Sequence, residues 1–178
     1  MEGLQMPTND TFDICGINHL ALVCQDMDRT VGFYSGVLGM PLTKTITLPN
    51  GMGQHFFFDI GNGDHLAFFW FPNAKPGVPG VSHPAGQVGD GDITSAPASM
   101  NHVAFNVPLE RIDEYQSKLE AAGVNPTAVV NHDESERGIS EDISETTFVR
   151  SIYFKDPDGI LLEFAAWTPE PDRGDATS

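Results

Sequence analysis

The chain has 178 residues, 40% of them hydrophobic, which suits one well-cored domain or two small modules that share a core. Its 25 acidic and 9 basic residues give a net charge of −16, which argues against a nucleic-acid partner because Lys and Arg supply the affinity for phosphates. No apolar run approaches the roughly eighteen residues of a membrane helix, and the start of the chain lacks the pattern of a secretory signal. We therefore expect a cytoplasmic protein that does not bind membranes.

The first predicted strand spans residues 15–24, where apolar and polar side chains alternate with period two. His19 lies on one face of this strand, and residues 1–13 before it have no periodicity and are predicted to form a flexible arm. Cys15 and Cys24 stand at opposite ends of the strand, about 30 Å apart at the usual rise per residue. A disulfide between them is therefore not expected.

A helix and three more strands complete the first module, residues 14–72. Asp26 is a typical N-cap residue and Gly39 is typical of the position after a helix, so we expect the helix between them. Turn-forming residues then separate three predicted strands, at 40–48, 54–60 and 65–71. The module is therefore predicted to have the order βαβββ.

The last two strands of this module are rich in aromatic residues, most of which are expected in the core. Phe69 and Phe71 share a face with His65, because side chains two residues apart point to the same side of a strand. We predict an apolar cavity suited to a flat ring, with Phe69 and Phe71 in contact with the substrate.

Residues 73–98 are rich in Pro and Gly and form a predicted linker, either a functional cover or a disordered segment. His83 within it is expected at the surface, with a lid contact to substrate as the alternative. The second module, residues 99–168, repeats the order of the first, and residues 169–178 form a predicted flexible tail. The expected elements are a strand at 99–107, a helix at 108–122 and strands at 127–130, 148–154 and 160–167, with an acidic loop at 132–145 and a tight turn at 156–159.

The motif Asn-His-x-Ala opens both modules, with its histidines at His19 and His102, and Glu163 interrupts the last apolar strand. A lone strand histidine is most often a satisfied core residue, but buried imidazoles and carboxylates are costly unless they are paired or bind a metal. The repetition favours one shared site. Two imidazoles and one carboxylate on one face of an ion leave positions open for substrate and oxygen, as in non-haem Fe(II) sites.

The two motifs, with the closing segment from Tyr153 to Phe164, resemble the vicinal oxygen chelate superfamily of glyoxalase I, bleomycin and fosfomycin resistance proteins and extradiol dioxygenases. The resemblance spans residues 15–167. It implies an α+β fold in which tandem βαβββ modules form an incomplete eight-stranded barrel around one divalent ion. It is also compatible with a homodimer.

Glyoxalase I relatives carry a carboxylate in both modules, whereas here Ala67 stands at the position that corresponds to Glu163. The remaining set of His19, His102 and Glu163 looks like the metal triad of small one-domain extradiol dioxygenases similar to dihydroxybiphenyl dioxygenase. What this resemblance implies is Fe(II)-dependent cleavage of a catecholic ring by O2.

The same resemblance suggests roles for two further residues. His65 is similar to the acid/base histidine of extradiol enzymes, and Tyr153 to the tyrosine that hydrogen-bonds the catecholate. The extradiol pattern carries a histidine nine residues before this tyrosine, where the chain has Ser144. His132, in the same predicted loop, could deliver the proton instead, although a solvent-exposed histidine is the simpler expectation.

Two other functions remain open. A non-redox isomerase or lyase would use Mn(II), Zn(II), Ni(II) or Co(II) as a Lewis acid, although Ala67 counts against a glyoxalase-like version. A metal-free protein that binds an aromatic ligand would need only the cleft, and the intact set of two histidines and Glu163 counts against it.

Overall fold

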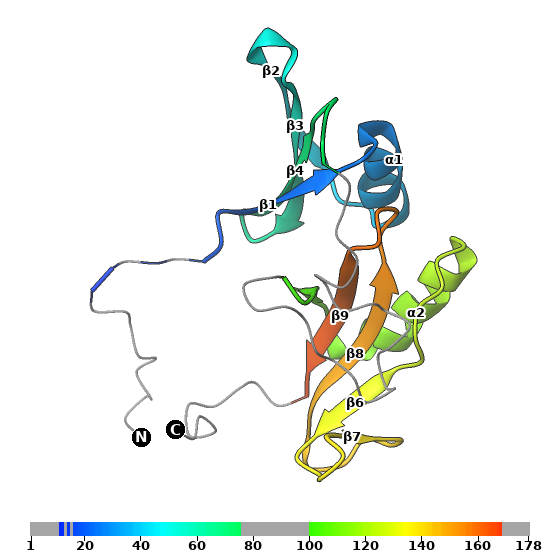
Figure 1. Cartoon of the computed structure of the whole chain (residues 1–178). Helices are drawn as coiled ribbons and strands as arrows, with labels where there is room; N and C mark the ends of the chain where they lie inside the picture. Colours follow the sequence, from blue (N-terminus) through cyan, green and yellow to red (C-terminus); the bar gives the residue numbers. More distant parts are fainter. Residues whose placement is uncertain (1–10, 13, 15, 76–99, 169–178) are drawn as a thin grey trace.

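The computed structural model describes residues 11–12, 14, 16–75 and 100–168 (Figure 1). Cys15, His83, most of the predicted arm and linker, and all of the predicted tail lie outside these residues. The strands are β1 His19–Cys24, β2 Leu42–Leu48, β3 Gly53–Gly61, β4 Asp64–Trp70, β5 Val103–Asn106, β6 Val130–Asp133, β7 Ile139–Ser140, β8 Thr147–Lys155 and β9 Leu161–Trp167. The helices are α1 Met27–Val31, the π-helix η1 Gly32–Val37, the 3-10 turns η2 Pro49–Gly51 and η4 Leu109–Arg111, and α2 Ile112–Ala121.

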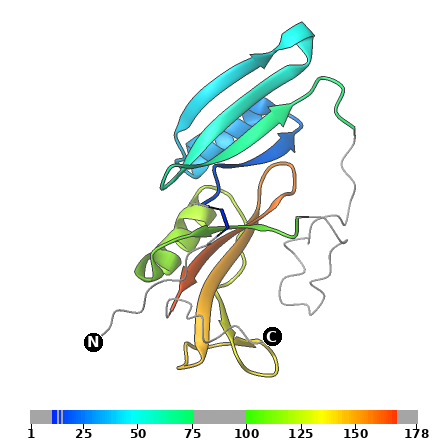
Figure 2. The ribbon, with the colours of Figure 1, turned by 90° about the vertical axis from the view of Figure 1, so that its left-hand side faces the viewer.

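The strands form two mixed sheets with the same pattern of pairing. The first sheet has the order β1-β4-β3-β2 and the second the order β5-β9-β8-β6-β7. In each sheet the opening strand runs parallel to the last strand of its module, β1 with β4 and β5 with β9. The α+β class and the duplicated module are therefore confirmed. Figure 2 shows the two sheets one above the other, each with a helix on one side, and the described strands form no closed barrel.

The first helix begins where the sequence predicts, whereas α2 begins at Ile112, after the 3-10 turn η4, and not at residue 108. The Asp26 side chain accepts a hydrogen bond of 2.9 Å from the Arg29 amide, which caps α1, and the helical path continues through η1. Gly39 follows with a φ of 71°, a left-handed conformation that glycine adopts without steric cost.

The prediction of an acidic loop at 132–145 is partly wrong, because these residues include the end of β6 and all of β7. β6 begins three residues after the predicted start at 127, and β7 pairs with it. The buried Asn131 amide donates to the carbonyl oxygens of Ser140 and Glu141, at 3.3 and 2.9 Å. Polar groups thus stabilise this hairpin, and they leave no apolar alternation for the sequence to show.

The two modules contact each other through their helix-covered sides. One core cluster includes buried residues of both modules, among them Phe58 and Phe68 from the first and Ile152 and Phe154 from the second. Each such side chain contributes roughly 1.5 to 3 kcal/mol by burial.

Polar contacts from the turn at 156–159 reinforce this packing. The hydroxyl of Tyr34 donates to Asp156 at 3.2 Å, while Asp158 accepts from the Gln25 amide at 2.9 Å and pairs with Arg29. The predicted tight turn is therefore also a contact between the modules.

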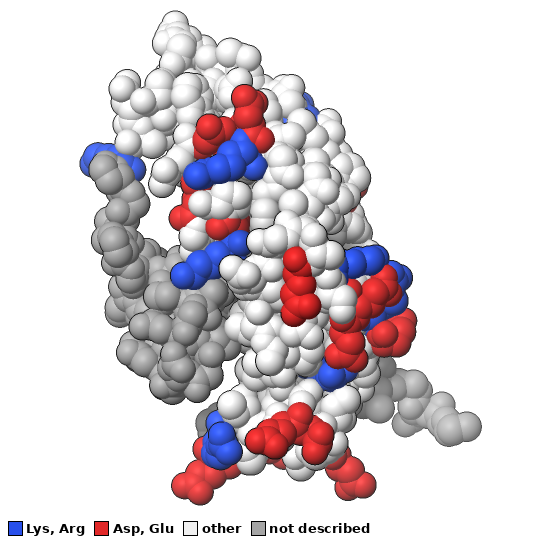
Figure 3. All heavy atoms as spheres, turned by 90° about the vertical axis from the view of Figure 1, so that its right-hand side faces the viewer, with Lys and Arg blue, Asp and Glu red and all other residues white. Residues whose placement is uncertain are grey.

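Charge is unevenly spread over the face shown in Figure 3. On the face in Figure 3, basic side chains lie next to acidic ones, and acidic side chains gather at the lower end, where β6 and β7 lie. No helix in the described part of the chain is long and apolar enough to cross a membrane.

Candidate metal centre and substrate face

His102 and Glu163 meet on the face of the second sheet opposite its helix. β5 and β9 pair with Ala104 beside Glu163, so His102, two residues before Ala104, projects from the same face. Its Nε2 atom lies 2.9 Å from Oε2 of Glu163. The Glu163 side chain is buried, and about a third of the His102 side chain (34%) is exposed.

Hydrogen-bond donors surround the Glu163 carboxylate. Ser151, on the neighbouring strand β8, donates its hydroxyl to Oε1 of Glu163. Burial by itself raises the pKa of Glu163, but hydrogen bonds from His102, Ser151 and Tyr153 outweigh it and hold that pKa below its usual value. The carboxylate is therefore ionised at neutral pH, which is the form that binds a cation.

Each asparagine of the repeated motif fixes the histidine that follows it. Nδ1 of His19 lies 2.7 Å from Oδ1 of Asn18, and Nδ1 of His102 lies 2.7 Å from Oδ1 of Asn101. Because an amide oxygen only accepts, Nδ1 carries the proton in both rings. Nε2 of His19 is then the nitrogen available to a metal, an arrangement common among metal-binding histidines. Nε2 of His102 donates to the Glu163 carboxylate and would bind a metal after losing that proton.

The corresponding face of the first sheet carries His19 and His65, and Asp59 of β3 is the register partner of His65. These two histidines are register partners on β1 and β4, and Ala21 pairs with Ala67 as Ala104 pairs with Glu163. Ala67 therefore occupies the position of Glu163, as the sequence indicated. A methyl side chain cannot bind a metal, so the position equivalent to Glu163 supplies no ligand in the first module.

A row of rings extends from His19 across this face. His19 lies 5.6 Å from Phe57 between ring centroids, and Phe57 lies 4.3 Å from His55. His55 stacks on Phe69 at 3.6 Å and 12°, and Phe69 stacks on Phe71 at 5.4 Å and 9°. The predicted pair of Phe69 and Phe71 thus belongs to a longer aromatic surface.

The sequence reading missed His55 and Phe57 in this row. They alternate within the strand predicted at 54–60, and this alternation could have placed them on one face. Burial, and then the nearby His19, lowers the pKa of His55. Its Nε2 atom is buried without a hydrogen-bond partner among the described residues.

The triad predicted for a single chain is not assembled. Among the described residues, no three His, Cys, Asp or Glu side chains lie close enough to hold a metal ion. His19 belongs to β1 in the upper sheet of Figure 2. His102 directly precedes β5 and Glu163 lies in β9, and both of these strands belong to the lower sheet. The physical reason is the packing of the modules through their helix-covered sides, which leaves the two ligand-bearing faces on separate sheets.

Tyr153 lies beside the pair of His102 and Glu163. Its ring is edge-on to that of His102, with centroids 5.9 Å apart, and its hydroxyl lies 3.0 Å from Nε2 of His132. Burial, followed by the Glu163 charge, raises the pKa of Tyr153. The hydroxyl of Ser144, by contrast, hydrogen-bonds to Thr146 and Thr147 in its own loop, so Ser144 does not act as part of this cluster.

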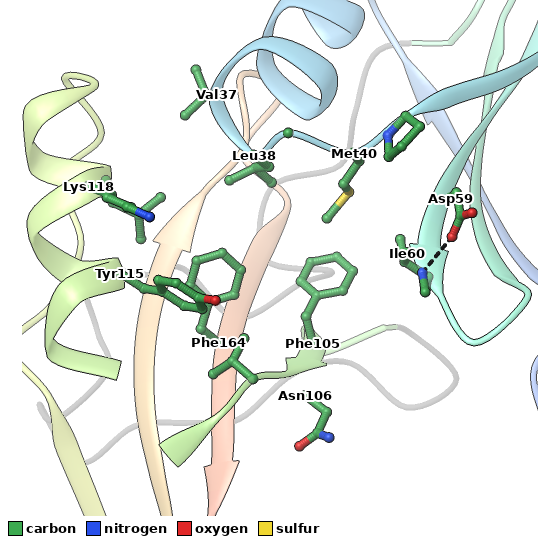
Figure 4. A pocket seen from close by; sticks show the side chains of 15 residues that line it. Val37, Leu38, Met40, Asp59, Ile60, Phe105, Asn106, Tyr115, Lys118 and Phe164 are labelled. Atoms are coloured by element: carbon green, nitrogen blue, oxygen red, sulfur yellow. Dashed lines mark hydrogen bonds between the residues drawn. The ribbon is translucent and has the colours of Figure 1, made fainter. Parts of the chain in front are cut away.

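A hollow of about 620 Å³ lies elsewhere, between η1 and α2 (Figure 4). Its walls are largely apolar and come from both modules, with the rings of Phe105, Tyr115 and Phe164 on one side and Leu38 and Met40 on the other. None of the metal-ligand candidates lines it, so this hollow is separate from the centre described above.

Residues 16–164 match the family model of the Glyoxalase/Bleomycin resistance protein/Dioxygenase superfamily. The chain belongs to this superfamily. Among relatives, it is 28% identical over 149 residues to the metallothiol transferase FosB of Shouchella clausii, covering 83% of this chain and 77% of that protein. It is 28% identical over 114 residues to the putative ring-cleaving dioxygenase MhqE of Bacillus subtilis, covering 62% of this chain and 32% of the relative.

A solved structure of the superfamily gives the same fold. The fosfomycin resistance protein FosX of Listeria monocytogenes, in complex with Mn(II) and sulfate, superposes with a TM-score of 0.53 at 21% identity, over 87% of this chain and 94% of that chain. At this identity the likeness concerns the fold alone. The superfamily relatives named here carry different activities, so the chemistry of this chain has to be inferred from its own residues.

Proposed function

We propose that this superfamily member is a divalent-metal-dependent enzyme, with the ion held by His102 and Glu163 of one copy and His19 of the partner subunit. The observation that carries the proposal is the 2.9 Å contact between His102 and Glu163. An imidazole nitrogen and an ionised carboxylate meet there, and Asn101 and Ser151 orient them. This is the donor chemistry that first-row divalent metals prefer.

A second copy of the chain is proposed because one copy supplies only part of the set. His19 has the same Asn-fixed geometry as His102 but lies on the other sheet. In a symmetric dimer the same two surfaces meet twice, so one contact between a first-module face and a second-module face would complete two sites. A homodimer is therefore part of the proposal.

Fe(II) is the ion we propose, because two histidines and one carboxylate form the facial set of non-haem iron enzymes. Mn(II), Zn(II), Ni(II) and Co(II) fit the same donors, and Mn(II) is the ion in the FosX complex. A bound ion supplies Lewis acidity toward a vicinal diol and, as Fe(II), redox capacity toward O2.

The substrate proposed is an aromatic diol, and the reaction is extradiol ring cleavage. A flat ring would stack on the aromatic surface that starts at Phe57 and continues through Phe69 and Phe71. In this reaction the ring carbon–carbon bond beside the diol breaks and both atoms of O2 enter the product. The ring-cleaving name of the MhqE relative supports this choice.

His65 and Tyr153 are the proposed catalytic residues. His65 is the register partner of His19, so its imidazole is placed to take a proton from a diol hydroxyl held near the metal. The Tyr153 hydroxyl lies at the Glu163 side of the centre, where it can hydrogen-bond a substrate oxygen. We propose that the enzyme acts in the cytoplasm.

A second candidate function keeps the metal and omits the redox step. The FosB relative is named a metallothiol transferase and its match covers 83% of this chain, which favours a metal-dependent reaction without O2. The long aromatic surface favours the ring-cleaving reaction over this one. A metal-free protein that binds an aromatic ligand would retain only that surface.

The test is the metal content of anaerobically purified protein, followed by catechol addition with and without O2. Ring cleavage predicts about one iron per chain and a yellow product that needs oxygen. Turnover with Zn(II) under anaerobic conditions would instead favour the non-redox reaction. Protein that takes up no divalent ion and still binds catechol would contradict both metal-dependent functions.

A further inference from the structure

His132 lies against the hydroxyl of Tyr153, close to the pair of His102 and Glu163. The distance from its Nε2 atom to the tyrosine oxygen is 3.0 Å. We propose that His132 is a positioning residue, which holds Tyr153 so that Tyr153 in turn holds the Glu163 carboxylate in its metal-binding orientation. This inference rests on the proposed function, because it concerns the same metal centre.

The strand pairing fixes the place of His132. β6 runs antiparallel to β8 with His132 opposite Val149, and the side chain is half-buried. Its ring is edge-on to Tyr153, at 6.2 Å and 87°, and also packs near Phe148 at 6.4 Å. The imidazole is thus confined between two rings, and its hydrogen bond to Tyr153 has a defined direction.

The number of protons that each group can donate decides which group donates and which accepts. Tyr153 is the register partner of Glu163, so the two side chains project from the same face, and we assign the one hydroxyl proton of Tyr153 to the carboxylate, which can only accept. The tyrosine oxygen must then accept from His132, which therefore carries its proton on Nε2. The result is a chain of donors from His132 to Tyr153 to Glu163, in which each bond polarises the next.

This series of hydrogen bonds acts together with Ser151. Ser151 donates to Oε1 of Glu163, while Oε2 faces Nε2 of His102. A glutamate side chain has several rotatable bonds, so a ligating carboxylate needs donors that hold one orientation. Loss of such a supporting partner typically weakens metal binding by about 10-fold to 100-fold.

The experiment compares Co(II) affinities of full-length variants at equal protein concentration by competition with a chelator, together with the visible spectrum of the bound Co(II). Tyr153→Phe and His132→Ala should each weaken binding by about 10-fold, and the double variant should bind no more weakly than Tyr153→Phe alone. His132→Gln should recover part of the affinity, because its amide can donate to Tyr153. The control is Val149→Ala, which removes packing opposite His132 and should keep both the wild-type affinity and spectrum.

Three results would overturn the inference. His132→Ala could bind Co(II) as tightly as wild type, its effect could add fully to that of Tyr153→Phe, or Val149→Ala could weaken binding equally. Glu163→Gln separates this inference from the proposed function. If Glu163→Gln loses binding while His132→Ala keeps it, only the positioning role fails, whereas wild-type affinity in Glu163→Gln removes the metal centre itself.

Discussion

Nε2 of His102 lies 2.9 Å from Oε2 of Glu163, across two strands that pair in parallel. The contact joins the start of the second module to its last strand, and the first module has Ala67 at the equivalent place. The duplicated fold has therefore kept a histidine in both modules and a carboxylate in one.

Glu163→Gln should reduce divalent-metal affinity at least 100-fold while the protein stays folded. Glutamine has nearly the same shape, and it still accepts from Ser151, but it lacks the charge that a metal requires. The measurement is Mn(II) or Co(II) binding, with circular dichroism as the check of folding. Glu110→Gln, at an exposed position in η4, is the matched control and should bind as wild type does.

His65→Ala should leave the metal bound and reduce kcat by about 100-fold or more, because general acid–base catalysis contributes roughly that much. The residue lies beside His19 without belonging to the proposed ligand set. Metal content and steady-state turnover of catechol should be measured on the same preparation. Loss of metal together with activity would make His65 a ligand rather than the proton-transfer group.

Tyr34→Phe should lower the free energy of unfolding by about 1.5 to 3 kcal/mol, the range for a hydrogen bond to a charged group. The tyrosine is fully buried, and its hydroxyl donates to the buried Asp156 across the contact between the modules. Urea unfolding is the measurement. Tyr115→Phe, on the partly exposed side of α2, is the control, and an equal loss there would argue against a special role for the contact with Asp156.

Acidification should destabilise the metal-free protein partly through His132. Burial lowers the pKa of His132, so the unfolded chain, with the ordinary value near about 6.5, binds a proton before the folded chain does. A histidine with a depressed pKa adds stability at high pH, and this stability is lost as pH falls through the ordinary value toward the folded one. Urea unfolding in EDTA from pH 8 to 5 should therefore show a shallower loss for His132→Gln than for wild type. If the unfolding free energies of the two proteins fell equally with pH, the lowered pKa of His132 would be contradicted.

The sequence predicted the parts of the fold that follow from local periodicity. Alternation placed His19 on one face of its strand, and the Asn-His motif identified both modules. It could not predict how the modules pack, because contacts such as that of Tyr34 with Asp156 join residues with no local signal. Because the sequence does not reveal this packing, it predicts a metal triad within a single chain, and the described residues do not form one.

Strands made of polar residues were the second feature that the sequence could not predict. The polar neighbours Asn131 and Asp133 predict a loop around His132, yet the hydrogen bonds of these buried side chains support a short strand that brings His132 to Tyr153. The buried Ser151 beside Glu163 gave no sequence signal, since serine is common in strands and loops alike.

The central claim is that the metal centre is shared between two copies, and subunit mixing tests it most directly. His19→Ala and Glu163→Gln proteins should each bind little metal alone. After unfolding and refolding together in equal amounts, random pairing should restore about a quarter of the wild-type sites, because each mixed dimer has one intact site. No recovery in the mixture, with mixed dimers verified by differential tagging, would contradict a shared site and return all three ligands to a single chain.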